Sequence, residues 1–329
     1  MLVIGLLFVY IRQVDLLMVQ SYVLGIGYNA IGILIATALA YFLATKAWQL
    51  CFSASGNQKV PGLGLLFMIR QAGESFTLVN PTNIVGGEFS KLYFLKRADV
   101  AYDQSGPSVV ISRVFIILSY LLIFFSCILF WFSTRGQSYV TLNVILGLLF
   151  IGLFSGVVLV VLVSSKLYLT RIISHTQRFL RRSWYERLYN SGRSLNIQLV
   201  RFFKNHKGRL LTVLALSSLH WLVGTLEFYF ILNALEVPCS YFDALVLEMG
   251  VMVFKSVGGF VPGQIGIEEY GNKVVLSLIG VPGAEIWLAV SVLRRARQLA
   301  WIGISLIFIL ILYKPFRFGH ILLLSRGTK

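Results

Sequence analysis

The feature that most constrains this chain is a set of long, almost uncharged apolar runs, such as Val109–Phe132 and Val140–Val163. Each run is long enough to cross a bilayer as a helix, which takes about 20 apolar residues. Of the 329 residues, 57% are hydrophobic and only 13% are charged, which excludes a soluble globular or a disordered chain. An outer-membrane barrel would show segments of about 10 residues with alternating polarity, and these are absent. The sequence therefore predicts an all-α integral membrane protein.

About six stretches are predicted to span the membrane, and two others are too irregular to do so. The predicted spans are residues 2–11, 23–44, 109–132, 140–163, 210–234 and 285–313. The first covers only about 15 Å as a helix, so we expect it to be short and tilted or to begin further upstream. Lys46 and Trp48 are expected to anchor the second span at the membrane interface. Glycine, proline and charged residues interrupt the two irregular stretches, 62–95 and 241–283.

The basic residues set the predicted orientation. The chain carries 29 Lys and Arg against 13 Asp and Glu, a formal net charge of +16. We interpret this excess as basic loops held against anionic lipid on the cytoplasmic side, so no nucleic-acid partner is expected. Residues 164–209 hold eleven Lys or Arg and one acid, Glu186, which predicts a cytoplasmic basic connector. The three cysteines are isolated and indicate neither a disulfide framework nor a metal site.

This orientation makes both irregular stretches re-entrant. With 164–209 in the cytoplasm, counting along the spans places the C-terminus in the cytoplasm as well. The stretch 62–95 then begins and ends inside, whereas 241–283 begins and ends outside. The sequence thus predicts a multi-pass protein of the cell inner membrane, with two broken-helix segments that enter from opposite faces.

The two broken segments also share their spacing. A single offset of 181 residues superposes three pairs of scarce residues: Pro81 on Pro262, Glu88 on Glu269 and Arg113 on Arg294. We interpret this as an inverted repeat of about 23–132 and 210–313 within a single transmembrane domain, 1–329. Inverted repeats with paired, interrupted segments are typical of transporters. The alternative is a coincidence of spacing.

The broken segments supply the predicted binding residues. Backbone that leaves a helix inside hydrocarbon must be buried in protein or line a wet cavity. The short helices after the breaks would point their N-termini at such a cavity, which favours an anionic headgroup. The predicted substrate-binding residues are Pro81, Asn83, Glu88, Arg113, Pro262, Gln264, Glu269 and Arg294. The alternative is that the breaks are ordinary interface loops.

Charged side chains inside a membrane are costly unless they are paired or hydrated. We therefore expect Glu88 to pair with Arg113 and Glu269 to pair with Arg294. In the functional interpretation the arginines attract a phosphate or another polar headgroup, and the glutamates hold or release them. In the structural alternative the pairs only join helices.

Short motifs for nucleotide binding or hydrolysis are absent: the chain has no G-x-x-x-x-G-K-[ST], G-x-S-x-G, H-E-x-x-H or C-x-x-C. We therefore expect no cofactor and no enzymatic activity. Two alternatives stay open. One is an intramembrane lipid-modifying transferase that uses the glutamates of the broken segments as bases. The other is a non-catalytic scaffold for lipid-biosynthesis enzymes.

Two segments, PTNIVGGEFSKLYFLKR (81–97) and GGFVPGQIGIEEYGNKVVLSLIGV (258–281), resemble the paired signatures of a known family. They are similar to the lysylphosphatidylglycerol synthase transmembrane, or flippase-like, family, and the run RRARQ at 294–298 resembles its following helix. The proline–glycine–glutamine form of the second segment is most similar to hopanoid-biosynthesis-associated members. The first segment departs from the pattern, because Ser90 and Lys91 stand where an arginine is common.

The resemblance extends from about residue 1 to residue 315. It implies an inner-membrane domain that moves or presents lipids between leaflets, with membrane lipids of polar or anionic headgroup as partners. In the aminoacyl-phospholipid members a separate cytoplasmic domain performs the synthesis, so the resemblance implies no synthase activity for this chain.

Overall fold

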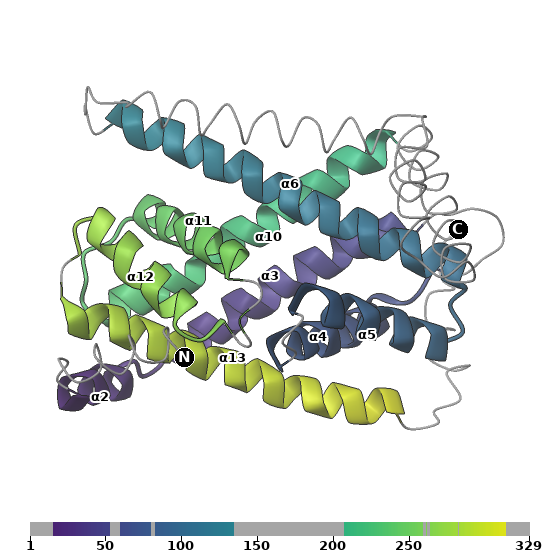
Figure 1. Cartoon of the computed structure of the whole chain (residues 1–329), viewed down its shortest axis with the longest axis horizontal. Coiled ribbons are helices and arrows are strands. Elements are labelled where there is room, and N and C mark those ends of the chain that lie inside the picture. Colours follow the sequence, from purple (N-terminus) through teal and green to yellow (C-terminus); the bar gives the residue numbers. More distant parts are fainter. Residues whose placement is uncertain are drawn as a thin grey trace, which may run out of the picture. The chain divides into compact units, whose positions relative to one another are not determined.

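A computed structural model describes residues 16–52, 60–79, 83–134, 207–258, 261, 264–281 and 283–313, and every regular element among them is an α-helix. The all-α prediction is therefore confirmed for these residues. They fall into two compact units, one drawn from residues 1–45, 61–98 and 218–329 and the other from 46–60 and 99–217. Figure 1 shows the helices of both units, and each unit is described by itself.

The described helices differ in whether they are long enough to cross a membrane. In chain order they are α2 (Leu16–Gly25), α3 (Asn29–Cys51), α4 (Leu63–Val79), α5 (Asn83–Arg97), α6 (Tyr102–Thr134), α10 (Lys207–Ala234), α11 (Tyr241–Val257), α12 (Ile267–Leu278) and α13 (Ala284–Tyr313). Four of them, α3, α6, α10 and α13, contain segments long and apolar enough to span a membrane. These correspond to four of the predicted spans, while 2–11, 140–163 and most of the 164–209 connector lie outside the described residues.

The predicted span 23–44 is displaced in the structure. Helix α2 ends at Gly25, and α3 begins at Asn29 after a turn in which Gly27 has a φ of 48°. Glycine adopts this left-handed conformation without a Cβ clash, so the apolar run is divided where hydropathy alone shows no break. The prediction of Trp48 as an interface anchor was wrong. Trp48 lies within α3 and is 1% exposed, and its indole N–H donates to Ser108 Oγ at 3.3 Å.

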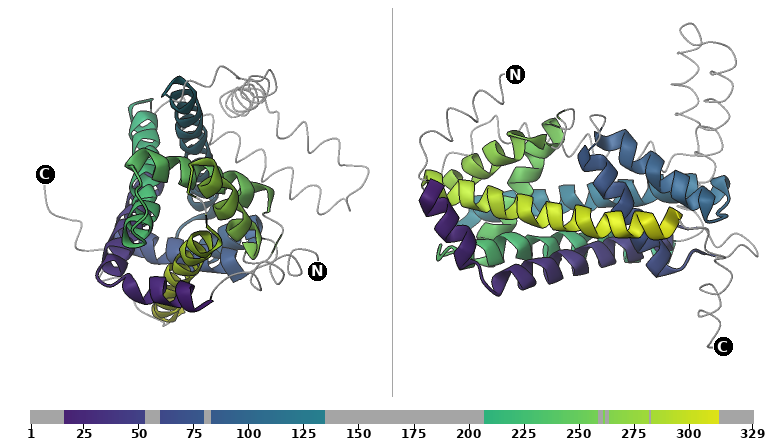
Figure 2. Two further views of the ribbon diagram at one scale, coloured as in Figure 1. Left: turned by 90° about the vertical axis from the view of Figure 1, so that its left-hand side faces the viewer. Right: turned by 90° about the horizontal axis from the view of Figure 1, so that it is seen from below.

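In the first unit, α13 is the helix on which two helical hairpins pack. Helix α12 of the α11–α12 hairpin contacts the first half of α13, where Asn272 Nδ2 donates to Ser291 Oγ at 2.9 Å. Helix α4 of the α4–α5 hairpin contacts the second half, where Ser305 Oγ donates to the Gln71 carbonyl at 3.1 Å. Figure 2 shows α13 running past both hairpins, with α2 against its first half.

Local sequence explains how the α11–α12 hairpin begins and turns. Ser240 and Asp243 form a reciprocal capping box at the start of α11, with backbone-to-side-chain bonds of 3.1 and 3.2 Å. Gly266 has a φ of 85° and directly precedes α12. Helices α4, α5, α11 and α12 are not among the candidate spans. Whether they are re-entrant, and whether the two hairpins belong to an inverted repeat, stays a prediction.

Candidate functional site

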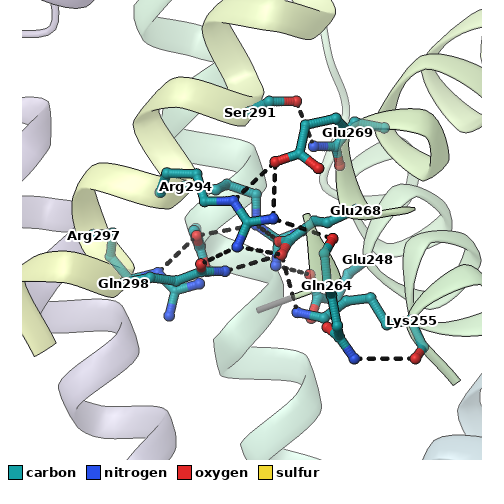
Figure 3. A network of polar contacts seen from close by, with 12 residues as sticks. Glu248, Lys255, Gln264, Glu268, Glu269, Ser291, Arg294, Arg297 and Gln298 are labelled. Atoms are coloured by element: carbon teal, nitrogen blue, oxygen red, sulfur yellow. Dashed lines mark hydrogen bonds and ion pairs between the residues drawn. The ribbon is translucent and has the colours of Figure 1, made fainter. Parts of the chain in front are cut away.

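A buried network of charged side chains joins α10, α11, α12 and α13 in the first unit (Figure 3). Nitrogen–oxygen distances of 4.0 Å or less connect its members into one group. We call this group the charge cluster; its members are Glu227, Glu248, Lys255, Glu268, Glu269, Arg294, Arg295 and Arg297. Among the residues that the structure describes, the cluster has four cations and four carboxylates, so this set is formally neutral.

Arg294 lies at the centre of the charge cluster and is 3% exposed. Its Nε donates to Glu227 Oε1 on α10 at 3.2 Å, and its Nη2 donates to Glu248 Oε2 on α11 at 3.3 Å. The same Nε lies 3.4 Å from Glu268 Oε1 on α12. Its guanidinium carbon also lies 4.1 Å from the centre of the Phe228 ring. One side chain on α13 thus holds carboxylates from three other helices.

The start of α12 supplies two adjacent acids to the charge cluster. Glu268 pairs with Lys255 Nζ at 3.4 Å and accepts from Gln298 Nε2 at 3.0 Å. Glu269 accepts from the Gly266 backbone N–H at 2.6 Å and pairs with Arg295 at 2.8 Å. Carboxylates in the first turn of a helix are stabilised by its N-terminal partial charge. Both acids therefore hold the N-terminus of α12 against α13.

Arg297 connects the charge cluster to α3. Its Nε donates to Glu227 Oε1 and its Nη1 donates to Tyr41 Oη, both at 2.9 Å. One turn further along α13, Trp301 Nε1 donates to Thr37 Oγ1 at 2.9 Å. These bonds tie α3 to the middle of α13, so five helices of the first unit meet around the cluster.

A second, smaller charged group lies on the α4–α5 hairpin. Lys91 Nζ is 3.2 Å from carboxylate oxygens of both Glu74 and Glu88, and Arg70 is 3.8 Å from Glu74. Lys91 is buried. Of the described residues, this group holds two cations and two carboxylates.

Of the predicted binding residues, the structure brings Gln264, Glu269 and Arg294 together. The Gln264 carbonyl accepts from Arg295 Nη2 at 3.2 Å, and the Gln264 side chain donates to the Lys255 carbonyl at 3.1 Å. Gln264 has a φ of 52°, unusual for a residue with a side chain, and these two bonds hold it in place.

The other predicted binding residues lie elsewhere. Glu88 belongs to the group on the α4–α5 hairpin, and Asn83 is the first residue of α5. Arg113 lies on α6 in the second unit. Pro81 and Pro262 fall outside the described residues.

The predicted pairing of Glu269 with Arg294 was wrong. The structure pairs Glu269 with Arg295, and Arg294 with Glu268 and two further carboxylates. Successive helical residues point about 100° apart, so a shift of one residue on each helix selects different neighbours. The pairing of Glu88 with Arg113 stays a prediction, since the two residues belong to different units.

Glu227, Glu248 and Tyr41 belong to this network but were not among the predicted binding residues. Glu227 carried a usable signal, because a carboxylate inside an apolar span is costly and therefore marks a paired or functional position. Tyr41 carried none, since a tyrosine within an apolar helix is equally compatible with lipid contact.

Comparison with known proteins gives one finding. The model of a family described as "Lysylphosphatidylglycerol synthase TM region" matches residues 1–307. No curated protein and no solved structure shows a significant match to the chain.

Proposed function

The chain belongs to the lysylphosphatidylglycerol synthase TM family, and on that premise we propose that it moves or presents a membrane lipid across the inner membrane. The family is associated with membrane lipids, and four described helices are long and apolar enough to span a bilayer. In this proposal the lipid headgroup binds in the charge cluster while the acyl chains stay in the hydrocarbon. The C-terminus faces the cytoplasm.

The observation that carries the proposal is the burial of Arg294 among carboxylates from three helices. Removing charges from water costs several kcal/mol per ion, and apolar side chains often replace a buried ion pair without loss of stability. Packing alone therefore does not account for eight charged residues gathered where four helices meet. In membrane proteins such residues commonly mark a substrate pathway.

The geometry supports a specific way of admitting a headgroup. Carboxylates already occupy Arg294 Nε and Nη2, so a lipid phosphate that binds these two nitrogens must compete with those carboxylates. Glu248 is the simplest partner to displace, because Arg294 is its one partner within the charge cluster, at 3.3 Å. We propose that α12 parts from α13, that the phosphate takes over one carboxylate's place, and that reclosure releases the headgroup on the other side. This cycle needs no cofactor and makes no covalent change in the lipid.

Proteoliposomes made from the host's own lipid extract would test the proposal. Impermeant reagents for amines and for vicinal diols would label the outward-facing headgroups, and mass spectrometry would follow each lipid class over time. Without transport, labelling stops at about half of each class. The proposal predicts that, with wild-type protein, the labelled fraction of one lipid class rises above one half.

The matched variants are Glu268→Gln in the charge cluster and Glu236→Gln in the exposed turn after α10. Movement should fall at least tenfold in the first variant and stay unchanged in the second. A new lipid mass would instead indicate a transferase. No movement by folded wild-type protein would reject transport and favour a scaffold for lipid-biosynthesis enzymes.

A further inference from the structure

We propose that the charge cluster selects a zwitterionic headgroup, one that combines a phosphate with an ammonium bearing N–H donors, over an anionic headgroup. The inference rests on the proposed function and specifies the class of its substrate. It is carried by the formal charge of the cluster and by three buried polar atoms on the seam between α12 and α13.

The charge balance of the cluster disfavours an anionic ligand. Its four cations and four carboxylates already neutralise one another. A headgroup with a net charge of −1 would leave an uncompensated charge in a closed, low-dielectric site, where such a charge is most costly. A zwitterionic headgroup adds no net charge.

Two atoms of the charge cluster and one atom of the neighbouring Asn272 define which donors and acceptors a ligand must offer. Arg294 Nη1, Glu268 Oε1 and Asn272 Oδ1 are buried and have no hydrogen-bond partner within the described part of the chain, and their residues are 3%, 2% and 0% exposed. Buried polar groups are normally hydrogen-bonded, because an unmade bond costs more than a typical bond contributes. The arginine atom donates, whereas the other two accept.

These atoms lie along one seam of the first unit. Glu268 and Asn272 are four residues apart on one face of α12. Glu268 Oε1 is 3.4 Å from Arg294 Nε, and Asn272 donates to Ser291, one turn before Arg294. A phosphate oxygen would accept from Arg294 Nη1, while the ammonium would donate to Glu268 Oε1 and Asn272 Oδ1. When α12 parts from α13, all three atoms become accessible together.

Three short-chain lipids separate the elements of this inference. Dihexanoyl phosphatidylethanolamine is zwitterionic and has N–H donors, whereas the corresponding phosphatidylcholine is zwitterionic and has none. The corresponding phosphatidylglycerol is anionic. Dissociation constants would be measured by calorimetry on the full chain in detergent, below the micelle concentration of each lipid. We expect the ethanolamine lipid to bind at least tenfold more tightly than either of the others.

Two variants change the formal charge of the cluster in opposite directions. Both keep the three buried atoms that have no hydrogen-bond partner. Glu248→Gln raises the formal charge to +1 and should move the preference toward phosphatidylglycerol. Lys255→Gln lowers it to −1 and should weaken phosphatidylglycerol binding further. Glu236→Gln, in the exposed turn, should leave all three dissociation constants unchanged.

Each outcome decides a separate claim. Equal binding of the ethanolamine and choline lipids would overturn the role of the N–H donors. Tighter binding of phosphatidylglycerol to wild type would overturn the inference while leaving lipid transport intact. If wild-type protein binds none of the three although it moves lipid in proteoliposomes, the headgroup class is wrong. If it neither binds nor moves lipid, the proposed function fails as well. The comparison on wild type decides the matter even if a variant fails to fold.

Discussion

At Arg294 the cost of burying a guanidinium is offset by carboxylates that come from three different helices. Each carboxylate is in turn a charge that needs this arginine or a neighbouring cation. The residues of the charge cluster are therefore interdependent, and removing one leaves another buried without its counter-charge. The effect of a substitution on function can be distinguished from its effect on stability only in variants that keep the cluster neutral.

Arg294→Gln should destabilise the protein by about 3–5 kcal/mol, because it leaves buried carboxylates uncompensated. Adding Glu248→Gln returns the cluster to neutrality and should restore part of that loss, with a coupling energy of about 1–3 kcal/mol. Thermal unfolding of the purified protein would measure both effects. Arg209→Gln, at an exposed arginine, is the control and should change little. Additive losses in the double variant would contradict the charge-balance argument.

Sequence reasoning found the central residues but not their partners. Arg294 and Glu269 were identifiable because charges are scarce in apolar segments. Which acid meets which arginine depends on the rotation of α12 against α13, and residue spacing within one helix does not encode that rotation. The contribution of Glu248 could not be predicted for the same reason, since it arrives from α11.

At the scale of elements, close helix crossing explains one glycine of the first broken segment. Gly87 lies within α5 at its crossing with α4, where a Cβ would collide with Thr77 Oγ1 and would lie 2.8 Å from the Gly73 carbonyl oxygen. The structure shows that this glycine allows two helices to approach each other.

Gly87→Ala should therefore destabilise the α4–α5 hairpin by about 1–3 kcal/mol, as overpacking does elsewhere. Gly303→Ala in α13 is the matched control, because its Cβ would meet open space. Replacing a helical glycine with alanine where there is room should stabilise by about 0.5–1 kcal/mol. Unfolding temperatures of the two variants should move in opposite directions. A Gly87→Ala protein as stable as wild type would show that the crossing is looser than described.

The apolar runs predicted α6, α10 and α13 well, because an uninterrupted run of about 20 apolar residues has the length of a membrane-spanning helix. They placed α3 poorly. Hydropathy does not register a glycine turn such as Gly27, and it does not distinguish a tryptophan that faces lipid headgroups from one buried in protein, such as Trp48.

At the scale of the whole molecule, the orientation in the membrane is a prediction that Cys239 can test. Its thiol lies in the loop between α10 and α11, which the positive-inside argument places on the outer side of the inner membrane, whereas Cys51 and Cys127 are buried. Burial raises the pKa of the Cys239 thiol to about 11, with the Asp243 carboxylate adding to the effect. An impermeant maleimide should label intact cells at Cys239 slowly at pH 7.

The labelling rate should rise about tenfold from pH 7 to pH 8, because the reactive thiolate fraction increases tenfold per unit below the pKa. Cys239→Ser should abolish the signal. Labelling that requires cell lysis would reverse the predicted orientation. A rate that already levels off near pH 9, as for an ordinary thiol with a pKa of about 8.5, would contradict the raised pKa.

Whether Arg294 binds the lipid headgroup can be measured by comparing lipid movement in wild type, Arg294→Gln and the Arg294→Gln/Glu248→Gln double variant. Initial rates in proteoliposomes would be normalised to the amount of folded protein. If Arg294 contacts the headgroup, the double variant recovers part of the lost stability but stays at least tenfold slower than wild type. If the double variant moves lipid at the wild-type rate, Arg294 only holds helices together, and the charge cluster is not where the lipid binds.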